Sequence, residues 1–243
     1  MNCFSIDPND HWLFVFAHPD DEIAIAGWIH HLVSFGVPVT CAWAHQTRVR
    51  RKESEDAMWI LGVLPEDQHF GDFPDGNFVD HLDQLTEWAE SLINGVEPTR
   101  VVTGAFEQGH LDHDSLNYSI KQAWKGTYLE FPLYHAFCNV IQKINTFSDP
   151  RSGQNWEIPP SGQIAKTSLI DCYPSQTVAR NLKLYRQLTK FKGDPADIDH
   201  IEKLRLHTVV DFLNPNSPPK LAKRILKTKE WKRWMRAMEG RIR

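Results

Sequence analysis

The sequence has few cysteines, no long apolar run and no large excess of charge of either sign. Its four cysteines stand far apart without a C-x-x-C pair, which argues against a disulfide scaffold or a structural zinc knuckle. The first apolar run, residues 12–17, is far shorter than the roughly 20 residues that span a bilayer. These absences indicate a reduced, globular protein rather than a secreted miniprotein or a membrane channel.

The charge balance excludes a general nucleic-acid binder. The chain has 31 acidic and 27 basic residues and a net charge of −4, whereas nucleic-acid-binding domains carry a strong basic excess. Residues 1–8 lack the basic and apolar regions of a signal peptide. We therefore expect a soluble cytoplasmic protein that acts on a small molecule and binds no nucleic acid.

Strand and helix patterns alternate through the first half of the chain. A length of 243 residues with 41% hydrophobic residues suits one substantial core. Apolar runs predict strands at residues 12–17 and 37–44, and further strands are predicted at 67–70 and 100–103. Amphipathic patterns predict helices at residues 23–33, 51–61, 81–93, 114–125 and 178–188. Such alternation predicts a single-domain α/β fold with a doubly wound, mostly parallel sheet.

Two clusters of histidine and acidic residues follow predicted strands. His18-Pro19-Asp20-Asp21-Glu22 comes after the first strand, and His110-Leu111-Asp112-His113 comes after the strand at 100–103. In doubly wound folds, ligands bind beyond the carboxyl ends of the strands, so the two clusters are expected to meet at one site. Each cluster alone also fits a capped helix start, where acids are favoured by the helix dipole.

Together the clusters supply the groups that a hydrolytic metal site needs. Such a site uses neutral imidazoles, a ligating carboxylate and a spare carboxylate that acts as a base. His18 and Asp21 are spaced to ligate one ion from a tight turn, which leaves Asp20 free beside it. His110 and His113 share a face if they lie on a helical turn. The pair of clusters therefore predicts a metal-dependent hydrolase.

The segment from residue 218 onward differs in charge from the rest. It holds ten of the 27 basic residues but only two of the 31 acids, which leaves 17 bases and 29 acids in residues 1–217. Apolar residues recur in it every three to four positions, so we expect a basic amphipathic C-terminal helix or tail at 218–243. Two readings stay open: a helix packed on the acidic body, and a helix bound to an anionic membrane surface.

The segment at residues 145–163 is rich in Pro, Gly, Ser and Asn. Segments of this kind are often lids or binding loops. Two readings of Trp156 stay open: a ring that stacks on a sugar, and a Trp packed in an exposed loop.

The motifs resemble those of the PIG-L/LmbE-like family of metal-dependent N-acetylglucosaminyl deacetylases. Ala-His-Pro-Asp-Asp-Glu at 17–22 and His-x-Asp-His at 110–113 carry the resemblance, which extends over about residues 11–190. Softer matches are Arg51, the turn at 73–76 and Tyr-Pro-Ser-Gln at 173–176. Leu111 stands where the family often has proline, at a position that supplies no ligand.

The resemblance implies a Rossmann-like fold, a bound Zn²⁺ or sometimes Fe²⁺, and hydrolysis of an N-acetyl group from a GlcNAc-type amino sugar. Carried over by motif, His18, Asp21 and His113 would be the metal ligands. Two histidines and one carboxylate leave a coordination position open for water. Asp20 would be the general base that takes the proton of that water.

The resemblance also implies roles for the remaining motif residues. His110 would polarise the acyl oxygen or protonate the leaving amine, and Asp112 would orient a histidine. Arg51 and Asp75 match positions used for sugar hydroxyls or anionic groups, although Arg48 and Arg50 compete with Arg51 for that role.

Two other functions fit the same motifs. One is a hydrolase of another amide or ester that uses the same metal site. The other is a catalytically silent protein that binds a sugar or nucleotide sugar on this scaffold.

Overall fold

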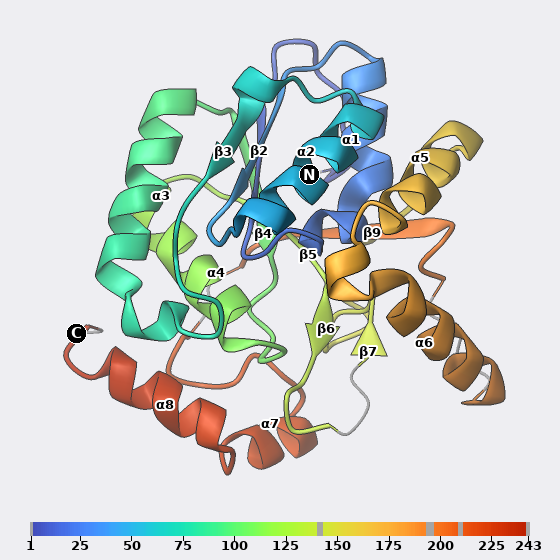
Figure 1. Ribbon diagram of the computed structural model, residues 1–243. Coiled ribbons are helices and arrows are strands. Elements are labelled where there is room, and N and C mark those ends of the chain that lie inside the picture. Colours follow the sequence, from blue (N-terminus) through green and yellow to red (C-terminus); the bar gives the residue numbers. More distant parts are fainter. Residues whose placement is uncertain (1, 140–142, 193–196, 209–210, 242–243) are drawn as a thin grey trace.

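The apolar run at the start of the chain forms an interior strand of a mostly parallel sheet in the computed structural model (Figure 1). The structure describes residues 2–139, 143–192, 197–208 and 211–241. Within these residues a seven-stranded sheet has the order β3-β2-β1-β4-β5-β9-β8. Strands β1 to β5 run parallel, and β9 runs antiparallel to both β5 and β8. The prediction of a single-domain α/β fold with a mostly parallel sheet is confirmed.

The elements follow one another with short connections. The strands of the sheet are β1 (Trp12–Phe16), β2 (Val39–Trp43), β3 (Gln68–Phe70), β4 (Arg100–Gly104), β5 (Leu129–Phe131), β8 (Gln154–Glu157) and β9 (Ile201–Leu206), and a separate antiparallel pair consists of β6 (Tyr134–His135) and β7 (Lys143–Ile144). The helices are α1 (Ala26–Ser34), α2 (Arg48–Leu61), α3 (Leu82–Val96), α4 (Leu111–Ala123), α5 (Pro160–Ile170), α6 (Val178–Lys192), α7 (Pro219–Ile225) and α8 (Lys229–Met238), with short 3-10 turns at η1 (Asp21–Ile25), η2 (Pro65–Asp67), η3 (Phe78–Asp80) and η4 (Pro174–Gln176).

Helices cover both faces of the sheet because successive side chains of a strand point to opposite faces. Trp12, Phe14 and Phe16 of β1 belong to one buried cluster, which includes apolar residues of α1, α2 and α5. Leu13 and Val15 belong to the cluster on the other face, which includes residues of α3 and α4. All five side chains are at most 1% exposed. A strand buried on both faces reads as a continuous apolar run, which is why the sequence pattern predicted it well.

Helix α4 begins at Leu111, three residues before the predicted start. His110 is its N-cap, and the His110 side chain accepts a hydrogen bond from the Asp112 backbone N–H. The first turn therefore contains both Asp112 and His113. Since Asp, Asn, Ser and Thr are the usual N-cap residues, a histidine in this position gave a weaker start signal in the sequence.

Residues 145–163, whose composition suggested a lid or binding loop, include regular secondary structure. This segment contains β8 and the first residues of α5. The ring of Trp156 packs against Trp28, Phe4 and His31 at the outer strand β8, so this tryptophan does not reach the histidine clusters. Strand β8 depends on pairing with β9, about 45 residues later, and such long-range pairing leaves little local signal.

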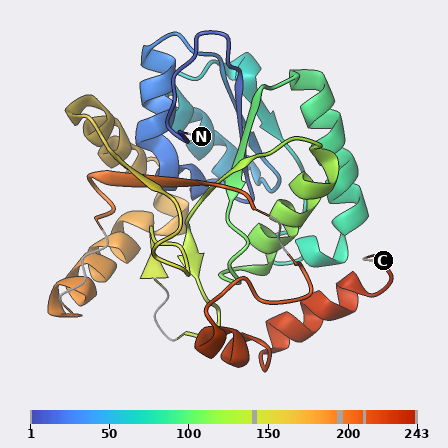
Figure 2. The ribbon, with the colours of Figure 1, turned by 180° about the vertical axis from the view of Figure 1, so that it is seen from behind.

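The basic C-terminal segment forms two helices, α7 and α8, which lie along one edge of the molecule in both views (Figure 1, Figure 2). Trp231, Trp234 and Met238 of α8 are buried in a cluster that also includes Phe106 and Tyr118 of the main fold. These contacts favour the reading of a helix packed on the body. The boundary expected at residue 217 stays a prediction, and Met1 and Arg243 of the expected segments lie outside the described residues.

Ion pairs add to the attachment of α8. Arg233 pairs with Asp80 at 2.5 Å, and Arg241 pairs with Asp83. Because the apolar face of α8 is already buried, this helix would have to leave the core before that face could enter a lipid surface. Over the described part of the chain, no helix is both long enough and apolar enough to cross a bilayer.

Removing the buried tryptophan of α8 tests this packing. Trp234 is 1% exposed and its Nε1 donates to the Phe212 carbonyl, so Trp234→Ala is expected to lower the free energy of unfolding by about 3–5 kcal/mol. Trp59→Ala, at a site 85% exposed, is expected to change it by less than about 0.5 kcal/mol. Urea unfolding measures both values. An equal decrease in unfolding free energy in the two variants would show that Trp234 does not pack in the buried core.

Candidate active site

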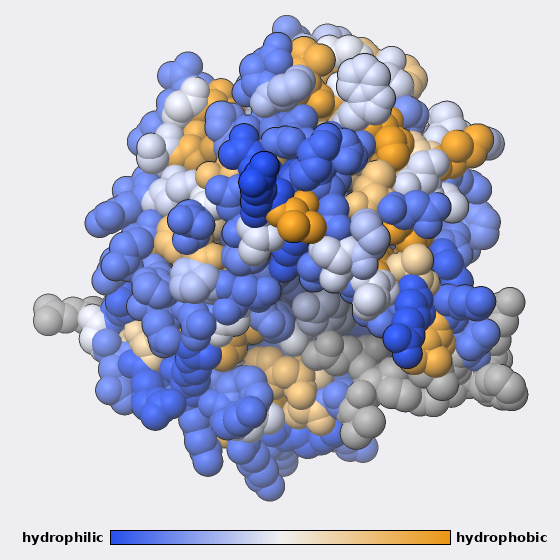
Figure 3. Space-filling view, in the orientation of Figure 1, coloured by the Kyte–Doolittle hydropathy of each residue, from blue (hydrophilic) through white to orange (hydrophobic). Residues whose placement is uncertain are grey.

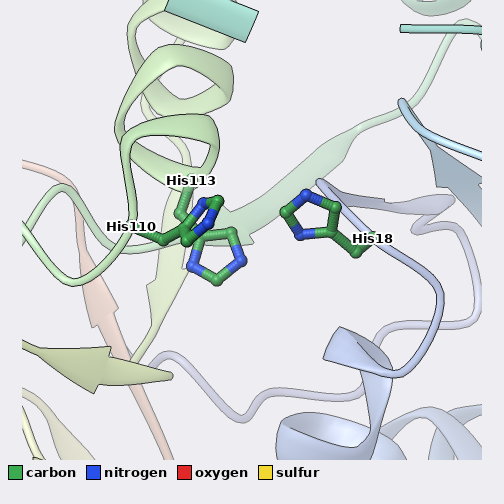
Figure 4. Close-up of side chains that lie close together, drawn as sticks. All are labelled: His18, His110 and His113. Atoms are coloured by element: carbon green, nitrogen blue, oxygen red, sulfur yellow. The ribbon is translucent and has the colours of Figure 1, made fainter. Parts of the chain in front are cut away.

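The two histidine clusters meet at the carboxyl edge of the sheet. His18 follows β1, while His110 and His113 stand at the start of α4, which follows β4. β1 and β4 are adjacent and parallel, so the segments that leave their carboxyl ends begin side by side. Figure 4 shows the three imidazole rings turned toward one common space. One ring nitrogen from each histidine lies within 4.8 Å of the others.

A tight turn holds the acidic residues that follow His18. The backbone N–H of His18 donates to Asp21 Oδ2 at 2.9 Å. Asp20 adopts the left-handed conformation with a φ of 105°, which aspartate tolerates better than most residues. This conformation turns the chain into η1, buries Asp21 and leaves Asp20 partly exposed beside it.

Asp21 connects the two clusters. Its Oδ1 lies 3.2 Å from His113 Nε2, and its Oδ2 lies 3.8 Å from His18 Nδ1. His113 Nε2 is buried, yet the geometry to Asp21 does not make a hydrogen bond. A buried nitrogen left unpaired against a carboxylate oxygen is costly, and a cation shared by the two atoms would remove that cost. The donor set of two histidines and one carboxylate therefore fits a zinc or ferrous ion.

The electrostatic field at the clusters also suits a cation. Burial lowers the pKa of His18, but hydrogen bonds to Asp112 and Asp75 and the charge of Asp21 outweigh it and raise this pKa to about 10. The pKa of Asp21 is also raised by burial, yet the neighbouring His113 and His18 shift it well below its usual range. Carboxylates that favour a proton on His18 equally favour a metal ion in its place.

Asp112 is fully buried and links three segments around the site. Its Oδ2 lies 3.0 Å from His18 Nε2 and accepts a hydrogen bond from the Gly76 N–H at 2.6 Å. Its Oδ1 accepts from the Phe78 N–H at 3.0 Å. Asp112 thus fixes the His18 ring and ties the turn at 75–76 to α4. The motif predicts that Asp112 orients a histidine, and that role stays a prediction.

The pKa values of Asp20 and His110, which flank the candidate ligands, shift in opposite directions. Burial, together with the charge of Asp21, raises the pKa of Asp20 to about 7. Burial and the neighbouring His113 lower the pKa of His110 to about 4, so this imidazole is neutral at pH 7. Since His110 Nδ1 accepts from the Asp112 N–H, its proton is assigned to Nε2.

Arg50, and not Arg51, faces the site. Arg50 is buried, and its Nη2 donates to the Pro19 carbonyl at 2.7 Å while its Nη1 donates to Asp75 at 3.3 Å. Arg51 is half exposed on the adjacent face of α2, where it pairs with Glu55 at 2.9 Å. The prediction that Arg51 lies at the site is therefore wrong. Three arginines in four positions share the same charge, and only the orientation of α2 distinguishes them.

Glu22 is a further site residue to which the motif assigned no role. Its Oε2 accepts from Trp43 Nε1 at 3.0 Å and from the Asp20 N–H at 3.1 Å, and its Oε1 is bonded by the Tyr173 hydroxyl. Burial raises the pKa of Glu22 to about 8. Glu22 therefore anchors the turn that carries Asp20 to β2 and to the Tyr-Pro-Ser-Gln segment. In the sequence, the only indications of this anchoring were the motif matches at residues 17–22 and 173–176, which contain Glu22 and Tyr173.

These residues line one end of a cavity of about 340 Å³. His18, Asp20, Asp21, Arg50, Asp75 and His110 are among its polar lining residues, which also include Lys166 and Asp199. Ile23, Leu133, Ile170 and Leu182 are among the apolar residues that line the rest. A concave site that combines apolar walls, polar groups and several shifted pKa values is typical of a small-molecule or active site.

Comparison with known proteins confirms the resemblance inferred from the motifs. Residues 13–124 match the model of the PIG-L family, described as GlcNAc-PI de-N-acetylase. A relative from Bacillus cereus, described as probable N-acetyl-alpha-D-glucosaminyl L-malate deacetylase 2, is 31% identical over 134 residues. That match covers 46% of this chain and 60% of the relative. Both histidine clusters lie inside the segment that matches the family model.

Solved structures share the fold. The zinc-inhibited form of teicoplanin deacetylase Orf2 aligns with a TM-score of 0.61 and 15% identity, over 83% of this chain and 99% of that one. The A40926 pseudoaglycone deacetylase Dbv21 aligns with a TM-score of 0.61 and 16% identity, over 84% and 100% of the two chains. At these identities the likeness establishes the α/β architecture.

Replacing a candidate ligand tests the metal site. His113→Ala and His18→Ala are each expected to reduce bound zinc from about one ion per chain to near zero, because a three-ligand site that loses one ligand binds weakly. Metal analysis after dialysis measures this stoichiometry. His200→Ala, whose side chain is 62% exposed in the wild type, serves as the control and should retain the metal. Full metal content in either site variant would remove that residue from the ligand set.

Proposed function

We propose that this protein is a metal-dependent deacetylase that hydrolyses the N-acetyl group of a GlcNAc-type amino sugar or its conjugate. One observation carries the proposal: His18, Asp21 and His113 converge at the carboxyl edge of the sheet, and Asp20 lies beside them in the lining of a cavity. The family match and the Bacillus cereus relative, whose description names a deacetylase, support the same reaction.

His18, Asp21 and His113 would hold a zinc or ferrous ion. When bound, such an ion lowers the pKa of water to about 7 and polarises the amide carbonyl. Asp112 keeps the His18 ring in position through its 3.0 Å contact. Fixing a ligand in this way reduces the reorganisation that binding requires.

Asp20 is the proposed general base. A group with a pKa near the working pH both accepts a proton from water and returns it efficiently. Its pKa of about 7 meets this condition, and its position beside Asp21 brings it close to the candidate ligands. The Glu22 carboxyl bonds the Asp20 backbone N–H, which holds the base in place.

His110 is the proposed donor to the reacting amide. Its neutral ring, with the proton assigned to Nε2, faces His18 and His113 with ring centroids 5.3 Å away in each case. A neutral N–H donor in this position would stabilise charge on the acyl oxygen, whereas protonating the departing amine would require the imidazolium form of His110. Arg50 and Asp75 line the same cavity and are proposed to bond sugar hydroxyls.

We also propose a cytoplasmic location and a small-molecule substrate. Scattered cysteines that form no disulfide among the described residues are typical of a reducing compartment. The acidic balance of the chain is unfavourable for nucleic acid.

Acetate release tests the reaction. Zinc-loaded and iron-loaded protein is expected to release acetate from at least one N-acetylated amino sugar or conjugate in a panel. Asp20→Asn is expected to keep its metal and lower turnover about 10²–10⁴-fold, the usual contribution of a general base.

Asp56→Asn, at an exposed position on α2, is the matched control and should keep full activity. Wild-type turnover in Asp20→Asn would reject the assigned base. Release of a different acid, or binding without any release despite full metal content, would favour another amide or ester hydrolase or a silent sugar-binding protein, respectively.

Neighbouring arginines of α2 provide a second test. Arg50→Ala removes charged hydrogen bonds to the site and is expected to lower kcat/KM about 10–100-fold. Arg51→Ala changes the same charge on the other face and is expected to alter kcat/KM less than about twofold. Steady-state kinetics compare the two, and a larger effect of Arg51→Ala would return the sugar-binding role to Arg51.

A further inference from the structure

Glu202 of β9 and Lys166 of α5 form a buried ion pair next to the candidate site. Lys166 Nζ lies 2.7 Å from Glu202 Oε1, and the two residues are 6% and 0% exposed. Charged groups are usually left in water, as on the largely hydrophilic face that Figure 3 shows. The cost of removing two charges from water largely offsets their attraction, so net stability alone does not explain such a pair.

Glu202 supplies the N-terminal cap that helix α1 lacks. The N-cap residue of α1 is Ile25, whose side chain has no acceptor for the free N–H groups of the first turn. Glu202 Oε1 accepts from the Gly27 N–H at 2.8 Å, and its Oε2 accepts from the Trp28 N–H at 2.7 Å. A carboxylate in this place also meets the positive end of the helix dipole. A residue of β9 therefore fixes where α1 begins.

Lys166 holds the chain just before α1. Its Nζ donates to the Ala24 carbonyl at 3.4 Å, and Ala24 lies within η1. Lys166 and Ala24 both line the first cavity. The ion pair thus bonds the backbone on both sides of the junction between η1 and α1, with Lys166 on the η1 side and Glu202 on the α1 side.

Close packing leaves this junction little room to move. A Cβ atom on Gly27 would lie 2.7 Å from Ile158 Cγ2 and 3.1 Å from Glu202 Oε1, so glycine is what lets the carboxylate approach the backbone of α1. Helix α5 lies alongside α1 in both ribbon views (Figure 1, Figure 2), and α5 and β9 both contact η1.

The junction carries the acidic turn of the site. Asp21 is the first residue of η1, and its Oδ1 lies 3.2 Å from His113 Nε2. Asp20 immediately precedes it, and α1 follows η1 without a break. His113 belongs to a different element, α4, so any shift of the start of α1 moves Asp21 relative to this histidine.

We propose that Glu202 and Lys166 are positioning residues, which fix the place of η1 for the reaction. They keep Asp21 opposite His113 and Asp20 beside it. This inference rests on the proposed function and adds to it two residues that neither histidine cluster contains. Both lie beyond residues 13–124, the segment that matches the family model, so the site depends on α5 and β9 as well as on the motifs.

Metal affinity and the separate values of kcat and KM test this role. Glu202→Gln keeps the volume of the side chain but leaves one of the two N–H groups without an acceptor. It is expected to weaken zinc binding and to lower kcat, each about tenfold, as for residues that orient metal ligands. KM should change less than about twofold, because Glu202 is not among the described residues that line the cavity. Competition with a chelator measures zinc affinity, and steady-state kinetics measures kcat and KM.

Lys166→Met provides a second variant, which decides the question if Glu202→Gln does not fold. It removes the bond to the Ala24 carbonyl and is expected to lower zinc affinity and kcat at least threefold. A rise in KM alone would assign Lys166 to substrate binding and overturn its positioning role.

Asp10→Asn is the matched control. Asp10 forms a partly buried ion pair with Arg100 at 3.0 Å where β4 begins, at the edge of the sheet opposite the site. The same change from acid to amide there should leave zinc affinity and kcat within about twofold. Zinc affinity and kcat that stay at wild-type values in Glu202→Gln, or losses of equal size in Asp10→Asn, would overturn the proposal. If the wild type binds zinc but releases no acetate, the proposed function fails by itself, and the zinc affinity of Glu202→Gln still decides the positioning role.

Discussion

The parallel direction of β1 and β4 is the constraint on which the site depends. Adjacent parallel strands release their following segments at the same edge, so residues about 90 positions apart in sequence come together without a long loop. An antiparallel pairing would place His18 and His113 at opposite ends of the sheet. The burial of these two strands between helices on both faces is therefore a condition for the site as well as for the core.

Buried carboxyl groups then convert this proximity into a fixed geometry. Asp112 joins His18, the turn at 75–76 and η3, whereas Glu22 joins the turn at Asp20 to β2 and Tyr173. Burying a carboxyl group is costly unless its oxygens are hydrogen-bonded, and here both groups have several partners. The acids of the motif therefore have two roles. Asp20 and Asp21 line the cavity, whereas Asp112 and Glu22 hold residues of the site in place.

Local patterns in the sequence predicted most of the fold and the identity of the site. Continuous apolar runs gave the parallel strands, and the two histidine clusters gave the residues that the structure brings together. The features that were missed depend on contacts between distant segments. Strand β8 exists through its pairing with β9, and Trp156 packs on Trp28 rather than over the site. The choice of Arg50 over Arg51 follows from how α2 is oriented on the sheet, which charge alone does not reveal.

The central claim is that the two clusters form one hydrolytic metal centre. Its most direct measurement is the rate of acetate release from an N-acetylated amino sugar while metal-free protein is titrated with zinc or ferrous iron. If the two clusters form one metal centre, acetate is not released without metal, and the rate rises in proportion to bound metal up to about one ion per chain, as expected for a single catalytic site. A rate that is the same in metal-free protein, or that does not follow metal occupancy, would contradict it.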